Sequence, residues 1–255
     1  MTRSPLRAAA AWLVPLALAA CASVPPRGPA TSDLVFPSRY LQAILAQPAP
    51  YDSARAYPLL VALHGYGDTA PGFAQAFGAG SWERCFVAIP EAETALANGG
   101  TSWYPLTSDR TRWPALDGHA VAAVVALIEA VRARYHVGAV YVLGFSQGAT
   151  LAYQIGLLHP DLVSGVLAVA GRLPDVDTVG AIVHAADLER ARGLRILVAR
   201  GRDDPTLPRR AFLGQADFFA SRGYAVTRYE FAGGHDLPAE VMVRISRWLR
   251  EAPRP

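Results

Sequence analysis

The clearest candidate for a reactive side chain is a serine flanked by a glycine two positions away on either side. Residues 141–149 read as an apolar strand, then Gly-x-Ser-x-Gly around Ser146, then the start of a helical pattern. Such a sharp strand-to-helix turn has no room for a β-carbon at either flank, so Ser146 is strained and its oxygen exposed. The following helix directs its N-terminal dipole at the point where acyl transfer develops negative charge. The pattern predicts a nucleophilic serine rather than a structural turn.

A serine hydroxyl is a weak nucleophile and needs a general base that a carboxylate orients. His235 lies in a glycine-rich loop, Gly233-Gly234-His235, between the last predicted strand and the last predicted helix. The other histidines come before Ser146 or before any loop that could supply the acid; they are His64, His119, His136, His159 and His184. We therefore predict that His235 is the base, and that His64 is a loop-shaping hydrogen-bond donor.

The orienting acid is expected between Ser146 and His235 in the chain. Asp203 and Asp204 both follow the predicted strand 196–198, which places them at the carboxyl edge of a parallel sheet. Taken alone, either aspartate would be read as a helix cap or a turn former beside Pro205. Their position favours an acid, and we assign Asp204, with Asp203 as the alternative.

Two backbone N–H groups are predicted to bind the oxyanion. One is that of Gln147, directly after the nucleophile, and the other is that of Tyr66 in the glycine-containing loop 63–69. A side-chain change at Tyr66 would leave its N–H in place. Losing one such donor typically costs about 3 kcal/mol in the transition state.

The elements that must position these residues alternate along the chain. Short apolar runs predict buried parallel strands at 59–63, 86–89, 140–143, 166–169 and 196–198. Helical patterns lie at 117–134, 147–158, 209–222 and 239–250. Residues 39–45 predict an early antiparallel strand and 225–231 an edge strand. This order predicts an α/β fold with a mostly parallel central sheet and helices on both faces.

Composition is consistent with one globular domain. The chain has 255 residues, 52% of them hydrophobic and 18% charged, which excludes general disorder. The 24 basic residues, all arginine, are spread along the chain against 21 acidic ones, so nucleic acid is not an expected partner. We expect a single catalytic domain over residues 38–255.

The N-terminal residues predict export and a lipid anchor. Two arginines precede an apolar run that ends at Ala20, and Leu18-Ala19-Ala20-Cys21 resembles the lipobox of bacterial lipoproteins. The resemblance implies a signal peptide over 1–20, acylation of Cys21, and attachment to the cell envelope, at the outer membrane if the cell has one. Residues 21–37 then read as a proline-rich tether. An ordinary secretory signal is the alternative.

The segments around the candidate catalytic and oxyanion residues resemble the phospholipase/carboxylesterase family of α/β-hydrolases, which includes the acyl-protein thioesterases. The matching segments are 63–69, 144–149, 201–208 and 233–236. The resemblance implies the α/β-hydrolase fold, a Ser146–His235–Asp204 triad, no metal and no cofactor, and hydrolysis of carboxylic esters or thioesters. Residues 39–41 and 57–65 look more like secreted bacterial relatives that act on small or cinnamoyl-type esters and polyesters. The export signal distinguishes the chain from cytosolic thioesterases.

Specificity is expected to come from the long loop 91–116. It contains Trp103, Tyr104 and Trp113, which we interpret as one wall of an acyl or aryl pocket; packing of the loop is the alternative for the tryptophans. The expected substrate is a small-molecule or lipid ester. Two other functions stay open: a serine peptidase with the same triad, and a non-catalytic surface binding protein with a hydrolase shape.

Overall fold

The computed structural model describes residues 34–37, 41–78, 80 and 82–251. The predicted signal peptide, Cys21 and most of the predicted tether lie outside these residues. The last four residues assigned to the tether form strand β1 (Leu34–Pro37) instead. Its backbone pairs antiparallel with the next strand, β2 (Gln42–Ala46), a pairing that the proline-rich composition did not reveal.

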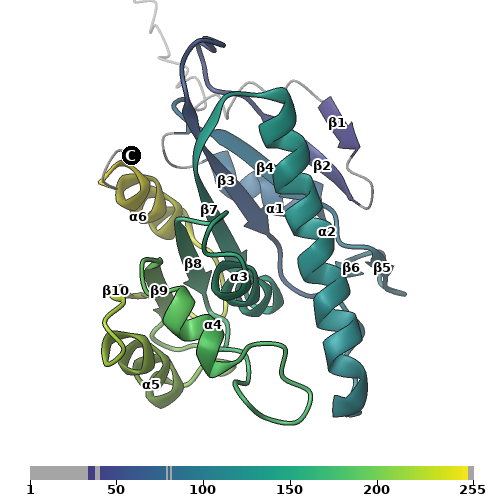
Figure 1. Ribbon diagram of the computed structural model, residues 1–255, viewed down its shortest axis with the longest axis vertical. Coiled ribbons are helices and arrows are strands. Elements are labelled where there is room, and N and C mark those ends of the chain that lie inside the picture. Colours follow the sequence, from purple (N-terminus) through teal and green to yellow (C-terminus); the bar gives the residue numbers. More distant parts are fainter. Residues whose placement is uncertain (1–33, 38–40, 79, 81, 252–255) are drawn as a thin grey trace, which may run out of the picture.

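The centre of the domain is one eight-stranded sheet in the order β1-β2-β4-β3-β7-β8-β9-β10 (Figure 1). The remaining strands are β3 (Tyr57–Leu63), β4 (Phe86–Pro90), β7 (Val137–Phe145), β8 (Gly165–Val169), β9 (Arg195–Gly201) and β10 (Ala225–Phe231). All six are parallel, whereas β2 runs antiparallel to β4. The predicted parallel sheet, the early antiparallel strand and the edge strand β10 are confirmed.

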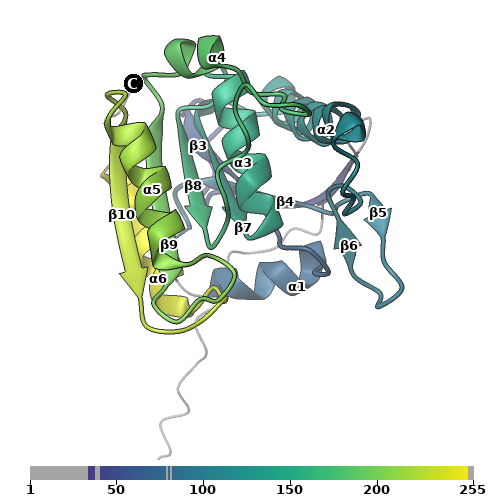
Figure 2. The same ribbon diagram turned by 90° about the horizontal axis from the view of Figure 1, so that it is seen from below.

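Helices cover both faces of the sheet, as predicted (Figure 2). The helices are α1 (Ala70–Ala74), α2 (Trp113–Arg134), α3 (Gln147–Leu158), α4 (Ala185–Arg190), α5 (Arg209–Ala220) and α6 (Ala239–Arg250). Residues of α2 to α5 pack into one buried apolar cluster, and residues of α1 and α6 into another on the opposite face. Alternate side chains of each buried strand enter one cluster or the other, which explains their continuous apolar sequence.

Helix α2 begins four residues earlier than the predicted Asp117, at Trp113. Pro114 stands in its first turn, where a missing N–H and a fixed φ angle favour helix initiation. The segment Arg110–Arg134 has the length and hydropathy of a membrane span. One side of α2 is nevertheless buried in the domain, including Val124, Leu127 and Ile128, so we assign it as a core helix.

The long loop 91–116 contains regular structure that was not predicted. It holds a small antiparallel hairpin, β5 (Thr94–Ala95) and β6 (Thr101–Ser102), and a 3-10 turn, η2 (Arg110–Arg112). A second 3-10 turn, η1 (Gln75–Gly78), follows α1. Two-residue strands carry no readable alternation, which is why the sequence did not reveal them.

Candidate active site

Ser146, His235 and Asp204 form one continuous chain of hydrogen bonds. The Ser146 Oγ lies 2.9 Å from His235 Nε2, and His235 Nδ1 lies 3.0 Å from Asp204 Oδ2. A carboxylate can only accept, so Nδ1 carries the proton and Nε2 is left to accept from the serine hydroxyl. The three side chains come from the loops after β7, β9 and β10, at the carboxyl edge of the sheet. This is the geometry of a nucleophile, a general base and an orienting acid.

Ser146 has the strained backbone predicted for it. Its φ and ψ angles are 54° and −114°, outside the regions that L-residues normally occupy. A β-carbon on Gly144 would lie 2.1 Å from the carbonyl oxygen of Gly148, and one on Gly148 would lie 2.4 Å from that of Leu63. Both glycines are therefore required by direct backbone contact.

Asp204 is buried, and backbone hydrogen bonds hold its carboxylate in place beside the histidine. It is 3% exposed, and its Oδ1 accepts the backbone N–H groups of Thr206 at 2.7 Å and Leu207 at 3.0 Å. The alternative, Asp203, is exposed, and its N–H donates to the Gly233 carbonyl oxygen. The structure thus places Asp204, rather than Asp203, beside His235.

Three of the other histidines have different partners. His64 is fully buried, its Nδ1 lies 2.8 Å from the Gly65 carbonyl oxygen, and the loop-shaping role predicted for it is confirmed. His119 pairs with Glu93, and His184 with Asp177.

Of the two predicted oxyanion donors, Gln147 directly follows the nucleophile, and Tyr66 is next in the chain to a residue that lies close to it. Gln147 is the first residue of α3, and a β-carbon on Gly65, next to Tyr66, would lie 3.4 Å from the Ser146 Cβ. Within the described part of the chain, no acceptor engages the backbone N–H of Tyr66 or of Gln147. Both donors are therefore available to a ligand atom.

The Gln147 side chain has a role that the sequence did not indicate. Its Oε1 accepts the Trp103 backbone N–H at 3.2 Å, and its Nε2 donates to the Tyr104 carbonyl oxygen at 3.1 Å and to the Ser102 hydroxyl at 3.0 Å. The segment 102–104 is thus attached to the residue after the nucleophile. Only tertiary structure reveals these contacts, because the partners are more than 40 residues apart in the chain.

A cavity of about 240 Å³ lies against this segment. Its lining combines aromatic, aliphatic and charged side chains: Glu93, Thr94, Trp103, Tyr104, Pro105, Leu116 and His119. Trp103 both lines the cavity and packs, since its indole N–H donates to the His64 carbonyl oxygen at 2.8 Å and it is 5% exposed. Trp113 does not line this cavity; its indole N–H donates to the Thr107 carbonyl oxygen, and the Arg110 guanidinium lies over its ring.

Burial shifts the pKa values of two ionisable side chains, Tyr104, which lines the cavity, and Asp117, which follows Leu116 in the chain. Desolvation, and secondly the charge of Asp117, raises the pKa of Tyr104. Desolvation also raises the pKa of Asp117, although a hydrogen bond from Gln154 opposes the shift. Among the described residues, no group of three or more histidine, cysteine, aspartate or glutamate side chains could hold a metal ion.

Comparisons with known proteins give a family and a fold for the chain. The model of the family described as phospholipase/carboxylesterase matches residues 51–252. No curated protein sequence matches the chain. Among solved structures, the chain is similar to esterase PE8, with 21% identity, a TM-score of 0.66, and coverage of 83% of this chain and 99% of the esterase.

Two further structures show the same α/β-hydrolase fold. A carboxylesterase from Mesorhizobium loti has 18% identity and a TM-score of 0.65, over 83% of this chain and 95% of its own. Acyl-protein thioesterase 2 from Zea mays has 20% identity and a TM-score of 0.62, over 83% of this chain and 98% of its own. At these identities the similarity establishes the fold.

Proposed function

Because the chain belongs to the phospholipase/carboxylesterase family, we propose that this ester hydrolase works through a Ser146–His235–Asp204 triad and an acyl-enzyme. The observation that carries the proposal is the hydrogen-bond chain from Ser146 Oγ to His235 and on to Asp204, at 2.9 Å and 3.0 Å. It joins residues 89 and 31 positions apart in the sequence. The same site also contains the strained backbone of Ser146 and two backbone N–H donors that no acceptor in the described part of the chain engages, a combination that a fortuitous contact between the three side chains would not explain.

In the first half-reaction, the Ser146 oxygen bonds to the ester carbonyl carbon while its proton passes to His235 Nε2. The carbonyl oxygen becomes an oxyanion, which the N–H groups of Tyr66 and Gln147 bind. His235 then returns the proton to the alkoxide, and the alcohol leaves. Water, deprotonated by the same Nε2, next attacks the acyl-enzyme, which releases the acid and restores Ser146.

The test is labelling and turnover of wild type and Ser146→Ala. We expect a fluorophosphonate to label wild type only, and p-nitrophenyl esters to be cleaved by wild type at least a thousandfold faster than by the variant. Equal labelling of both proteins would refute the proposal. A panel of matched esters, thioesters and amides distinguishes an esterase from a peptidase, and ester binding without turnover would indicate a binding protein.

We propose that the cavity beside Trp103 and Tyr104 receives the acyl group, because both residues are hydrogen-bonded to Gln147, next to the nucleophile. A cavity of about 150 Å³ holds a benzene ring, and pockets for drug-sized ligands begin near about 300 Å³. The cavity of about 240 Å³ therefore suits an aryl or short acyl group. We expect kcat/KM to peak at short or aryl acyl esters, and Leu116→Phe, which fills the cavity, to move the peak to smaller ones. A maximum at long-chain esters in both proteins would contradict this assignment.

The proposed lipid anchor rests on Leu18-Ala19-Ala20-Cys21 after the apolar N-terminal run. Two or more acyl chains on Cys21 would hold the enzyme at the envelope, since one chain alone binds only marginally. We expect the full chain, expressed in a bacterium, to incorporate labelled palmitate and to fractionate with membranes, and Cys21→Ser to do neither. Lipidation would be refuted if the wild-type protein incorporated no palmitate and fractionated in the same way as Cys21→Ser.

A further inference from the structure

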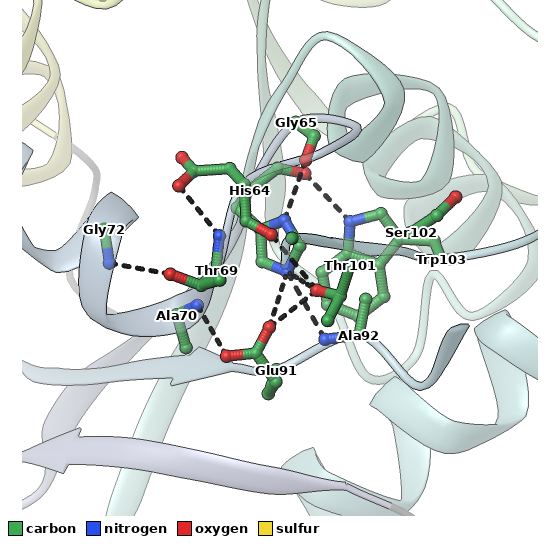
Figure 3. Close-up of polar contacts among 12 residues, drawn as sticks. His64, Gly65, Thr69, Ala70, Gly72, Glu91, Ala92, Thr101, Ser102 and Trp103 are labelled. Atoms are coloured by element: carbon green, nitrogen blue, oxygen red, sulfur yellow. Dashed lines mark hydrogen bonds and ion pairs between the residues drawn. The ribbon is translucent and has the colours of Figure 1, made fainter. Parts of the chain in front are cut away.

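The carboxylate of Glu91 lies next to the loop 63–69, which carries Tyr66, and it has no contact with the triad residues among its hydrogen bonds and ion pairs. Glu91 follows β4 directly, and its backbone N–H donates to the Gln42 carbonyl oxygen at 2.9 Å, which fixes its main chain to the sheet. Its side chain is 32% exposed. One oxygen, Oε2, accepts the backbone N–H of Ala70 at 2.8 Å, and the other, Oε1, accepts the Thr101 hydroxyl at 2.6 Å (Figure 3).

These two partners hold the loop from both sides. Ala70 begins α1, immediately after the loop. The backbone of Thr101 pairs with the loop itself, since it accepts the Gly67 N–H and donates to the Asp68 carbonyl oxygen, each at 2.9 Å. Glu91 therefore connects the start of α1, which follows the loop, to β6, which lies beside the loop.

His64, at the start of the loop, belongs to the same cluster (Figure 3). Its Nδ1 donates to the Gly65 carbonyl oxygen, so Nε2 is an acceptor, and the Ala92 N–H donates to it at 3.3 Å. Glu91 Oε1 lies 3.7 Å from the same Nε2. The carboxylate thus lies close to the beginning and the end of the segment that presents the Tyr66 N–H, and it binds Thr101, whose backbone pairs with the middle of that segment.

The apex of the loop is fixed by backbone bonds, those of Gly67 and Asp68 to Thr101 and that of the Asp68 N–H to the Gly65 carbonyl oxygen at 3.3 Å, rather than by buried side chains. Tyr66 is 48% exposed, and Gly67, with a φ angle of 80°, adds no side chain. The direction of the Tyr66 N–H is consequently set by these backbone bonds and the flanks of the loop rather than by the Tyr66 side chain. An error of about 1 Å in such a position can cost about a hundredfold in rate.

We propose that Glu91 is a positioning residue for the oxyanion hole: its carboxylate, by accepting from Ala70 and Thr101 at once, holds the Tyr66 N–H in line with Ser146. This inference rests on the proposed function. It assigns Glu91 no proton transfer and no contact with substrate. The required property is two acceptor atoms, so the neutral amide of glutamine should replace the carboxylate only in part.

The test compares Glu91→Gln and Glu91→Met with Glu129→Met, a matched control at an exposed position of α2. Active sites are counted by fluorophosphonate titration, so kcat refers to folded enzyme. We expect Glu91→Met to lower kcat about 10- to 100-fold with KM changed less than about threefold, Glu91→Gln to fall between it and wild type, and Glu129→Met to match wild type.

A second measurement isolates the oxyanion. A trifluoromethyl ketone forms a tetrahedral adduct with the serine, so its affinity should fall in Glu91→Met by the same factor as kcat/KM. If Glu91→Met does not fold, Glu91→Gln and Thr101→Val, which replaces the hydroxyl with a methyl group, decide the question.

Wild-type kcat and ketone affinity in the folded Glu91 variants, or a loss confined to KM, would overturn the positioning role. Absence of Ser146-dependent turnover in wild type would instead overturn the proposed function, so the two failures are distinguishable.

Discussion

Replacing Asp204 with asparagine should reverse the tautomer of His235, and the surroundings of the carboxylate determine how. Oδ1 accepts two backbone N–H groups, at 2.7 Å and 3.0 Å, and also lies 3.1 Å from His235 Nδ1. An asparagine must therefore keep its oxygen there, because an NH₂ group in that place would leave two buried donors unpaired, at about 1–3 kcal/mol each. Its NH₂ group then takes the place of Oδ2, 3.0 Å from His235 Nδ1.

An NH₂ group in that position donates to Nδ1, so the histidine proton moves to Nε2, which faces Ser146. Nε2 can then no longer accept the serine proton. In triads of this kind the wrong tautomer lowers kcat by about 10⁴-fold, equivalent to about 5 kcal/mol of barrier. We expect this loss for Asp204→Asn, measured as kcat with a p-nitrophenyl ester on protein of wild-type circular dichroism.

The matched control is Asp203→Asn, on the exposed neighbour in the same loop, which should stay within about twofold of wild type. More than a tenth of wild-type kcat in folded Asp204→Asn, or an equal loss in Asp203→Asn, would refute the assignment of the acid.

Three further outcomes are expected. Gly148→Ala should lose about 1–3 kcal/mol of stability and most activity, because its β-carbon would meet backbone oxygens, whereas Gly214→Ala, with open space in α5, should gain about 0.5–1 kcal/mol in urea unfolding. Burial raises the pKa of Asp117 above 3.8, so its charge destabilises the fold above that raised pKa; Asp117→Asn should raise Tm near neutral pH, and the gain should vanish as pH falls toward the ordinary value. Burial raises the pKa of the Cys85 thiol to about 12, so a Cys21→Ser chain should take up a thiol reagent only after unfolding; rapid labelling of the native chain would contradict this.

The sequence was sufficient for the central sheet and for the catalytic candidates because their signals are local. Uninterrupted apolar runs mark strands buried on both faces, and helices α3 and α6 begin and end at the predicted residues. The glycines around Ser146 and the glycine-rich loop of His235 are visible in a few consecutive residues. Chain order then selected the histidine, and the acid was assigned as Asp204 with Asp203 as the alternative.

What the sequence did not predict depends mostly on contacts between segments rather than on the pattern within one segment. Residues 34–37 form a strand because they pair with the edge of the neighbouring strand β2. The Gln147 side chain and the Glu91 carboxylate look like ordinary polar residues until the fold brings Tyr104 and Thr101 to them. Trp113 begins α2 rather than lying in the loop for a local reason, because Pro114 favours helix initiation in the first turn.

The order of strands in the sheet also determines when the site can exist during folding. The central strand β3 pairs with β7, although the two are separated in the chain by β4 and the whole of α2. Closing so long a loop costs chain entropy before any contact repays it, and such non-local pairings fold slowly. Asp204 and His235 follow β9 and β10, the last two strands to be synthesised. Under the proposed mechanism, a partly folded chain could therefore contain the strained serine turn without being able to hydrolyse an ester, and turnover would report the docking of the edge strand β10.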